Sequence, residues 1–142
     1  MKKGAKTMGS KTNLIVAGML SVGVTIAVSS PAYAARTYGA IAISAKAGVF
    51  GRSVGAATQA DAERAAMAQC TQLGGTDCRV ATWTRGKYCG AVAVKTYGDG
   101  GMSWAASSAP TLAEAKTQAM ERCQQEAKSA CDDVIADVCS DD

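Results

Sequence analysis

The side chains with the most reactive chemistry in this chain of 142 residues are six cysteines, because the sequence contains no histidine. Without histidine, Ser-His-Asp catalysis, Cys-His catalysis and histidine-ligated metal sites are excluded. The cysteines stand at wide intervals and form no C-x-x-C pair, which argues against a zinc site or a redox dithiol. We therefore expect no metal and no cofactor, and we interpret the even number of cysteines as a disulfide framework.

Carboxylates are the remaining groups with hydrolytic potential, since two of them set about 5 to 9 Å apart can cleave glycosides. Asp99 stands in a glycine-rich turn, and Asp132 precedes Asp133 directly. Glu63 and Glu114 fall in the first turns of predicted helices, where the helix dipole favours a carboxylate without any catalytic role. Because no spacing singles out a pair, the sequence predicts a protein that is not an enzyme and assigns no catalytic residue.

Residues 1–34 are typical of a secretory signal peptide. Lysines precede an apolar run at 14–28, and Ala32-Tyr33-Ala34 forms a small-x-small cleavage site. The run is shorter than the roughly 20 residues that a membrane-spanning helix needs. We therefore expect cleavage after Ala34, no stable membrane insertion afterwards, and a final location outside the cell or in the cell envelope.

The distribution of charge argues against a nucleic-acid partner. The formal net charge of +3 depends on four lysines within residues 1–34, a segment without acidic residues. The remaining residues, 35–142, carry 11 basic and 12 acidic side chains. A nucleic-acid-binding domain needs a basic surface to displace counterions from phosphates, and this segment is close to neutral. No nucleic-acid partner is expected.

An internal duplication organises the segment 35–142, because residues 38–88 and 89–139 share an ordered series of features. Both copies begin with a run that alternates small and β-branched residues, at 39–43 and 90–94. A glycine and a serine follow in each copy: Gly51 with Ser53, and Gly101 with Ser103. We predict that the two copies pack together into a single domain, because two units are too few for a solenoid.

Each copy changes from strand to helix periodicity in the same order. Alternation predicts a β-hairpin in each copy, with strands at 38–43 and 50–56 and at 91–96 and 102–107. Thr58 with Asp61, and Thr111 with Glu114, are capping patterns that begin a helix, and the face of the first helix carries Ala62, Ala66, Cys70 and Leu73. A third strand follows each helix, at 79–84 and 133–138. The predicted fold class is α+β: two tandem ββαβ units packed as one pseudo-twofold, disulfide-stapled domain.

The pairing of six thiols cannot be chosen rigorously from sequence, but the duplication narrows the choice. If both copies use the same local bridge, Cys70 pairs with Cys78, and Cys123 pairs with Cys131. Cys89 and Cys139 then remain, and their bridge would join the first strand of the second copy to the last strand of the chain.

Aromatic and arginine side chains give the predicted binding residues, because tryptophan and arginine are enriched in binding hot spots. Five of them fall on or beside predicted strands: Phe50, Arg52, Trp83, Arg85 and Trp104. For the two tryptophans we prefer the interpretation that both fill the core. Residues 35–142 contain only 13 Leu, Ile, Val and Phe residues, so the core is short of large apolar side chains. A partner is expected on the sheet face away from the helices or at an edge strand.

Several short motifs resemble a known family of small secreted actinobacterial proteins, described as domain of unknown function 4189. The motifs are Y-G-A-I-A at 38–42, G-R-S at 51–53, D-C-R-V at 77–80 and C-G-A-V-A at 89–93. The resemblance covers nearly all of residues 35–142. It implies export, duplicated ββα-type units and disulfides, and it implies no established catalytic residue. Some members look like effectors, while the pair Cys123 and Cys131 and the acidic tail depart from many relatives.

Together these observations favour a secreted, disulfide-stabilised, non-enzymatic interaction module, with an effector-like role as one form of it. Its expected partner is an unknown protein or a component of the cell envelope. Two other functions remain open at the level of sequence. One is a carboxylate-dependent hydrolase of envelope polymers, and the other is a protease inhibitor that uses the loop at 98–101.

Overall fold

The computed structural model describes residues 36–141, and its elements follow the order that the sequence predicts. The first half contains β1 (Tyr38–Ser44), β2 (Val49–Ala56), α1 (Gln59–Gln72) and β3 (Arg79–Arg85). The second half contains β4 (Cys89–Thr96), β5 (Met102–Ala109), α2 (Leu112–Ala127) and β6 (Asp133–Cys139). The predicted signal peptide, residues 1–34, lies outside the described residues. Within 36–141, neither helix has the length and apolar character needed to cross a membrane.

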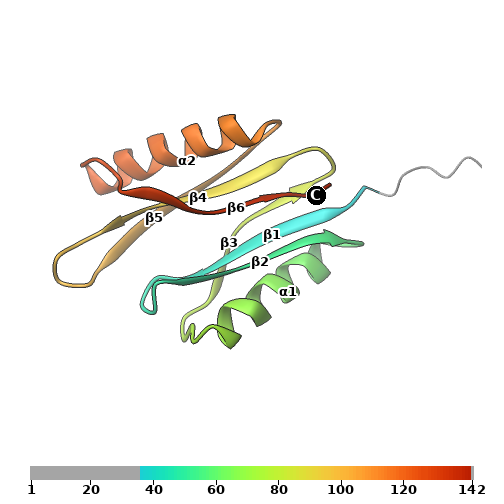
Figure 1. The fold of residues 1–142 in the computed structure, drawn as a ribbon, viewed down its shortest axis with the longest axis horizontal. Coiled ribbons are helices and arrows are strands. Elements are labelled where there is room, and N and C mark those ends of the chain that lie inside the picture. Colours follow the sequence, from blue (N-terminus) through green and yellow to red (C-terminus); the bar gives the residue numbers. More distant parts are fainter. Residues whose placement is uncertain (1–35, 142) are drawn as a thin grey trace, which may run out of the picture. The chain divides into compact units, whose positions relative to one another are not determined.

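The strands form two antiparallel sheets, each with the first strand of its half at the centre. The orders are β2-β1-β3 and β5-β4-β6. The sheets face each other, and each helix covers the outer side of its own sheet (Figure 1). This arrangement confirms the α+β class, with ββαβ order in both halves. A relation by a twofold axis stays a prediction.

Small side chains on one face of each central strand allow its helix to approach closely. Ala40 and Ala42 of β1 pack with Ala62, Ala66 and Cys70 of α1, and all five are fully buried. The second half repeats the pattern, with Ala91 and Ala93 of β4 packed against α2. The prediction that one face of these strands packs tightly is therefore confirmed, because alanine leaves room for a helix backbone.

The opposite faces of the two sheets pack against each other. Ile41 and Ile43 of β1 meet Val92 and Val94 of β4 in a separate apolar cluster. Gly39 permits the close approach of the sheets, since an added Cβ there would lie 2.8 Å from Thr84 Oγ1 and 3.0 Å from Val138 Cγ2. The expectation that a partner binds the sheet face away from the helices is wrong, because that face is buried between the sheets.

The strand registers correct one detail of the sequence correspondence. Gly51 of β2 lies opposite Ala42, whereas Ala105 of β5 lies opposite the equivalent Ala93. The counterpart of Gly51 is therefore Ala105, and the predicted match with Gly101 is wrong. The second hairpin has a longer connection between these paired positions, which moves the counterpart of Gly51 further along β5.

All six cysteines of the chain are paired, in the arrangement that the duplication favours. Cys70–Cys78 and Cys123–Cys131 each join the end of a helix to the segment before the next strand. Cys89–Cys139 joins residues directly opposite each other in the β4–β6 ladder. Leu73 is the C-cap of the first helix and is 56% exposed, so its predicted place on the packed face of that helix is wrong.

Candidate functional site

The five predicted binding residues separate into three places. Trp83 and Arg85 lie together in an open groove along β3. Phe50 and Arg52 lie in a smaller hollow between β2 and β6, with a volume of about 420 Å³. Trp104 is half-buried and packs against the apolar cluster between the sheets. The structure therefore does not bring the five together.

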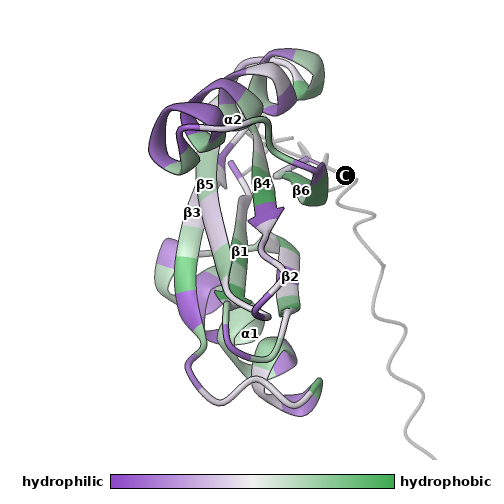
Figure 2. Ribbon diagram, turned by 90° about the vertical axis from the view of Figure 1, so that its left-hand side faces the viewer, coloured by the Kyte–Doolittle hydropathy of each residue, from purple (hydrophilic) through white to green (hydrophobic). Residues whose placement is uncertain are grey.

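We call the hollow along β3 the Trp83 groove; it is lined by residues 81–88, Arg36, Ser108 and Asp141. Its volume is about 1020 Å³, at the upper end of the range typical of ligand sites, roughly 300 to 1,000 Å³. Eight consecutive residues contribute to it, although alternate side chains of a strand point to opposite faces. The groove therefore follows the edge of β3 and continues into the junction between the halves. In Figure 2 β3 and β5 lie next to each other on the left of the view.

Trp83 is exposed because α1 leaves its part of the sheet uncovered. The residue lies opposite Ala40, on the helix side of the sheet, but α1 packs mainly against β1 and β2. The Trp83 ring is 6.4 Å from the Tyr38 ring, and the Arg85 guanidinium lies 5.5 Å above the same Tyr38 ring. With 43% of its surface exposed, Trp83 does not fill the core, and that interpretation is wrong for this tryptophan.

The outer edge of β3 presents backbone groups to the groove. Among residues 36–141, β3 forms its ladder with β1 alone. The bond from Gly86 N–H to Thr37 O, 2.9 Å, makes these two residues a hydrogen-bonded pair just beyond the strand. Because hydrogen-bonded and non-hydrogen-bonded pairs alternate in an antiparallel ladder, Arg85 and Trp83 direct their backbone groups outward. Arg85 O accepts from Tyr88 N, so the N–H and C=O of Trp83 and the N–H of Arg85 face the groove.

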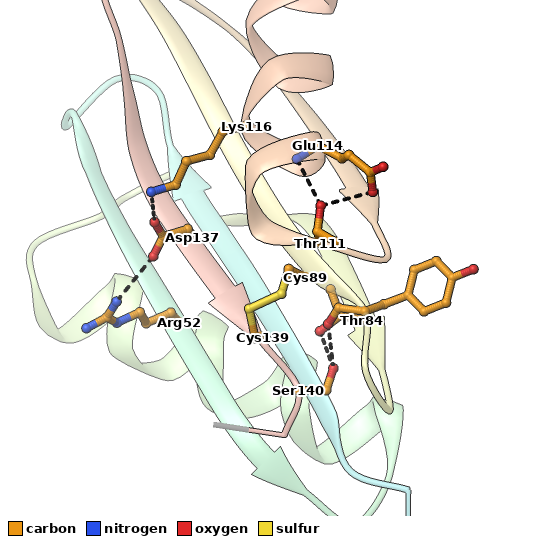
Figure 3. The surroundings of a disulfide bond; sticks show 10 residues. Arg52, Thr84, Cys89, Thr111, Glu114, Lys116, Asp137, Cys139 and Ser140 are labelled. Carbon is orange, nitrogen blue, oxygen red and sulfur yellow. Dashed lines mark hydrogen bonds and ion pairs between the residues drawn. A yellow bond between two sulfur atoms is a disulfide. The ribbon is translucent and has the colours of Figure 1, made fainter.

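A hydrogen-bonded support fixes the junction beside the groove. Ser140 is fully buried, bonds through its hydroxyl to Thr84, and accepts at its carbonyl a bond from Thr37 (Figure 3 shows the first of these). The Ser140 amide donates to Tyr88 O at 3.2 Å, next to the Cys89–Cys139 bridge. Both ends of the described chain are thus tied to the segment that carries Tyr88, which is 50% exposed.

The charges that line the groove are mostly positive. Arg36, Arg85 and Lys87 are exposed, and among the described residues 36–141 Asp141 is the one acidic residue that lines it. Within residues 36–141 no ion pair involves these three cations. The groove therefore offers positive charge beside two exposed aromatic rings, Trp83 and Tyr88, although the domain as a whole is close to neutral.

Sequence reasoning did not identify several groove residues, namely Arg36, Lys87 and Tyr88. The sequence places Tyr88 at the end of the first copy, as one of the aromatic residues available to the core. A usable signal exists, since Lys87 and Tyr88 come just after Arg85 and Gly86 at the junction of the copies. A segment that links two repeats is a natural place for a functional difference between them.

The corresponding edge in the second half is built differently. Asp137 of β6 lies opposite Ala91, as Trp83 of β3 lies opposite Ala40. Lys116 Nζ of α2 is 2.6 Å from Asp137 Oδ2, and Arg52 Nη1 is 4.0 Å from Asp137 Oδ1 (Figure 3). Charged side chains along an edge strand oppose the addition of another strand. The β6 edge is therefore protected, and Arg52 contributes to this protection.

Phe50 and Trp104 occupy equivalent positions and serve the core between the sheets. Phe50 lies opposite Ile43 in the β1–β2 ladder, and Trp104 lies opposite Val94 in the β4–β5 ladder. Both are half-buried against the cluster between the sheets, and the Arg79 guanidinium lies 5.1 Å from the Trp104 ring. Their surroundings favour a packing role.

The carboxylates considered for hydrolysis bond to groups in their own turn or to a neighbouring lysine. Asp99 Oδ1 accepts from Gly101 N at 2.9 Å, and Glu114 bonds to the N-cap Thr111. Asp132 accepts from Lys95 Nζ at 2.9 Å and from Thr96 N at 2.7 Å, and these bonds lower the pKa of its carboxyl group. Within residues 36–141 no three potential metal-ligating side chains gather into a cluster.

Comparison with known proteins gives a family and no activity. No curated protein and no solved structure shows significant similarity to the chain. The family described as domain of unknown function (DUF4189) matches residues 38–139, which begin with β1 and end with β6. Because this match covers most of the chain and both halves of the fold, the chain belongs to the DUF4189 family.

Proposed function

We propose that this protein is an exported, non-enzymatic binding module and that the Trp83 groove is its binding site. The observation that carries the proposal is the exposure of Trp83 on an edge strand, in a groove of about 1020 Å³. Large exposed aromatic side chains are costly to leave in water, and tryptophan and tyrosine are enriched where partners bind. The three disulfides suit an oxidising compartment outside the cytoplasm.

The rigidity of the site supports recognition by a preformed surface. The groove lies beside the Cys89–Cys139 bridge and the buried Ser140, so its walls need little ordering on binding. The site contains aromatic rings, cations and free backbone groups but no arrangement of a nucleophile with a base. Binding is the function that such a set of groups performs without further chemistry.

The test is a cross-linking pull-down with the exported protein and an envelope extract of the producing cell. The wild type is compared with Trp83→Ala and with Tyr97→Ala, a matched variant of an exposed aromatic residue away from the groove. We expect a partner that the wild type and Tyr97→Ala recover equally and that Trp83→Ala recovers at about one tenth or less, as for a hot-spot residue. A partner recovered equally by all three proteins would contradict the assignment of the site.

A further inference from the structure

We propose that the Trp83 groove binds an extended, acidic polypeptide segment, which adds as a fourth strand to the free edge of β3. This inference rests on the proposed function and names the class of ligand. Strand addition is a general mode of peptide recognition in which backbone hydrogen bonds hold the peptide and alternate side chains give specificity.

The backbone groups of β3 carry the first step of the argument. The N–H and C=O of Trp83 and the N–H of Arg85 face outward, two residues apart. This spacing matches a strand, where every second residue bonds to the same neighbour. A sugar chain or a nucleic acid has no repeating pair of donor and acceptor at that spacing, so these groups favour a polypeptide.

The contrast between the two equivalent edges carries the second step. On β6 the ion pair between Asp137 and Lys116, 2.6 Å apart, occupies the position that Trp83 occupies on β3. At this position β6 carries an ion pair, whereas β3 presents an aromatic ring beside Tyr38, with the charge of Arg85, unpaired within residues 36–141, two residues further along. One of the two third strands is accessible to a partner strand, and it is the one that lines the larger hollow.

Charge complementarity identifies the acidic character of the peptide. Arg36, Arg85 and Lys87 line the groove, against one acidic lining residue, Asp141, in the part of the chain that the structure describes. These cations attract a carboxylate of the peptide. Salt screens this attraction, with a screening length of about 10 Å at 0.1 M. Binding should therefore weaken as the salt concentration rises, while the hydrogen bonds of the added strand keep their geometry.

The experiment uses three synthetic peptides of about six residues, the usual length of a strand. In each, Glu alternates with Val, Thr or Tyr. Each peptide has three matched controls. In the first, Lys replaces Glu. In the other two, N-methyl groups block the backbone amides of either the odd-numbered or the even-numbered residues. Hydrogen exchange by NMR measures the protection of individual backbone amides in the exported protein, and titration gives the affinity.

We expect at least one Glu peptide to protect the amides of Trp83 and Arg85 and to leave those of Thr82 and Thr84, already bonded to β1, unchanged. Its Lys version and one of its two N-methylated versions should bind about tenfold more weakly, the loss expected from about 1.4 kcal/mol. The variant Trp83→Ala should lose the same protection, and Tyr97→Ala should keep it.

Several results would overturn the inference. These are no binding by any Glu peptide, equal binding by both N-methylated versions, or protection of β6 in place of β3. Equal protection by an acidic oligosaccharide such as oligogalacturonate would show that charge alone is recognised. Protection that grows with protein concentration alone would identify a second copy as the occupant. If one of these occurs while the pull-down still depends on Trp83, the binding site stands and only strand addition fails.

Discussion

Trp83 and Asp137 occupy the same ladder position in the two halves, each opposite an alanine of the central strand. Their chemistry is opposite, since one is an exposed aromatic residue and the other is a carboxylate held by Lys116. The two halves keep equivalent cores and differ at this edge. A duplication of this kind leaves one copy free to bind while the other preserves the protected edge.

The difference between the edges should be transferable. Glu63 of α1 occupies the position of Lys116 in α2, since each lies five residues after its N-cap threonine. The double variant Trp83→Asp with Glu63→Lys should recreate the protected edge on β3. We expect it to fold with a free energy of unfolding within about 1 kcal/mol of the wild type, as surface changes do, and to recover no partner in the pull-down. Undiminished recovery would show that the edge is not the binding surface.

The two tryptophans should differ in their contribution to stability. Trp83→Ala removes a ring that is 43% exposed, and we expect a loss of about 1 kcal/mol or less. Trp104→Ala removes a ring packed against the cluster between the sheets, and we expect a loss of about 2 to 3 kcal/mol. Urea denaturation of both variants measures the difference. A larger loss for Trp83→Ala would show that Trp83 is a core residue.

Gly51 should tolerate no side chain. An added Cβ would overlap the backbone at Ala66 O and Cys70 N of α1, which cannot move aside as a flexible side chain can. We expect Gly51→Ala to lower the free energy of unfolding by about 3 kcal/mol, the upper part of the range for overpacking. Gly98→Ala is the control, because nothing lies within 4 Å of its added Cβ. Equal stability of the two variants would mean that α1 lies farther from β2.

The Cys89–Cys139 bridge should contribute more stability than either local bridge. It closes a sequence separation of 50 residues, against 8 for Cys70–Cys78. Loop-closure entropy then predicts about 4 kcal/mol for the long bridge and about 2.5 kcal/mol for a short one. Paired Cys→Ala variants, compared by denaturation under oxidising conditions, measure this order. A smaller loss for the long bridge would contradict the entropic explanation.

Acid should destabilise the fold through carboxylates that bond to neighbouring groups. The bond from Ser44 holds the pKa of Asp77 below its ordinary value of 3.8, and the bond from Lys95 does the same for Asp132. A lowered pKa in the folded state stabilises the fold above the ordinary pKa, and this contribution is lost as the pH falls through the folded value. The free energy of unfolding should therefore fall below about pH 4.

The variants Asp77→Asn and Asp132→Asn should each flatten this dependence of stability on pH. Denaturant titrations at a series of acidic pH values measure the slope for each protein. A slope in either variant as steep as that of the wild type would show that the carboxylate in question does not contribute.

Much of the fold could be predicted from the sequence, because local patterns determine it. The alternation around Ile41 and Val92, the capping threonines Thr58 and Thr111, and the repeated cysteine interval predict the ββαβ units and the disulfide pairing. The face-to-face packing of the sheets could not be predicted, since periodicity shows that a strand face is apolar but not what covers it. That packing is what makes the sheet faces unavailable to a partner.

The Trp83 groove was harder to predict from the sequence than the fold. The exposure of Trp83 depends on the position of α1 over β1 and β2, which is a tertiary property. Tyr88 lines the groove, and its carbonyl accepts a bond from Ser140 N, a contact between residues far apart in the sequence. Phe50 and Trp104, by contrast, are residue types that are common in binding sites, but both pack against the core between the sheets.

The most direct test of the site is photo-cross-linking in the producing cell, with a photoreactive amino acid placed at one tyrosine at a time. Tyr88 lies in the groove and is 50% exposed, whereas Tyr97 lies outside it and is 38% exposed. The Trp83 groove as binding site predicts a discrete adduct from position 88 and none from position 97. Adducts from position 97 alone, or equal adducts from both, would contradict it.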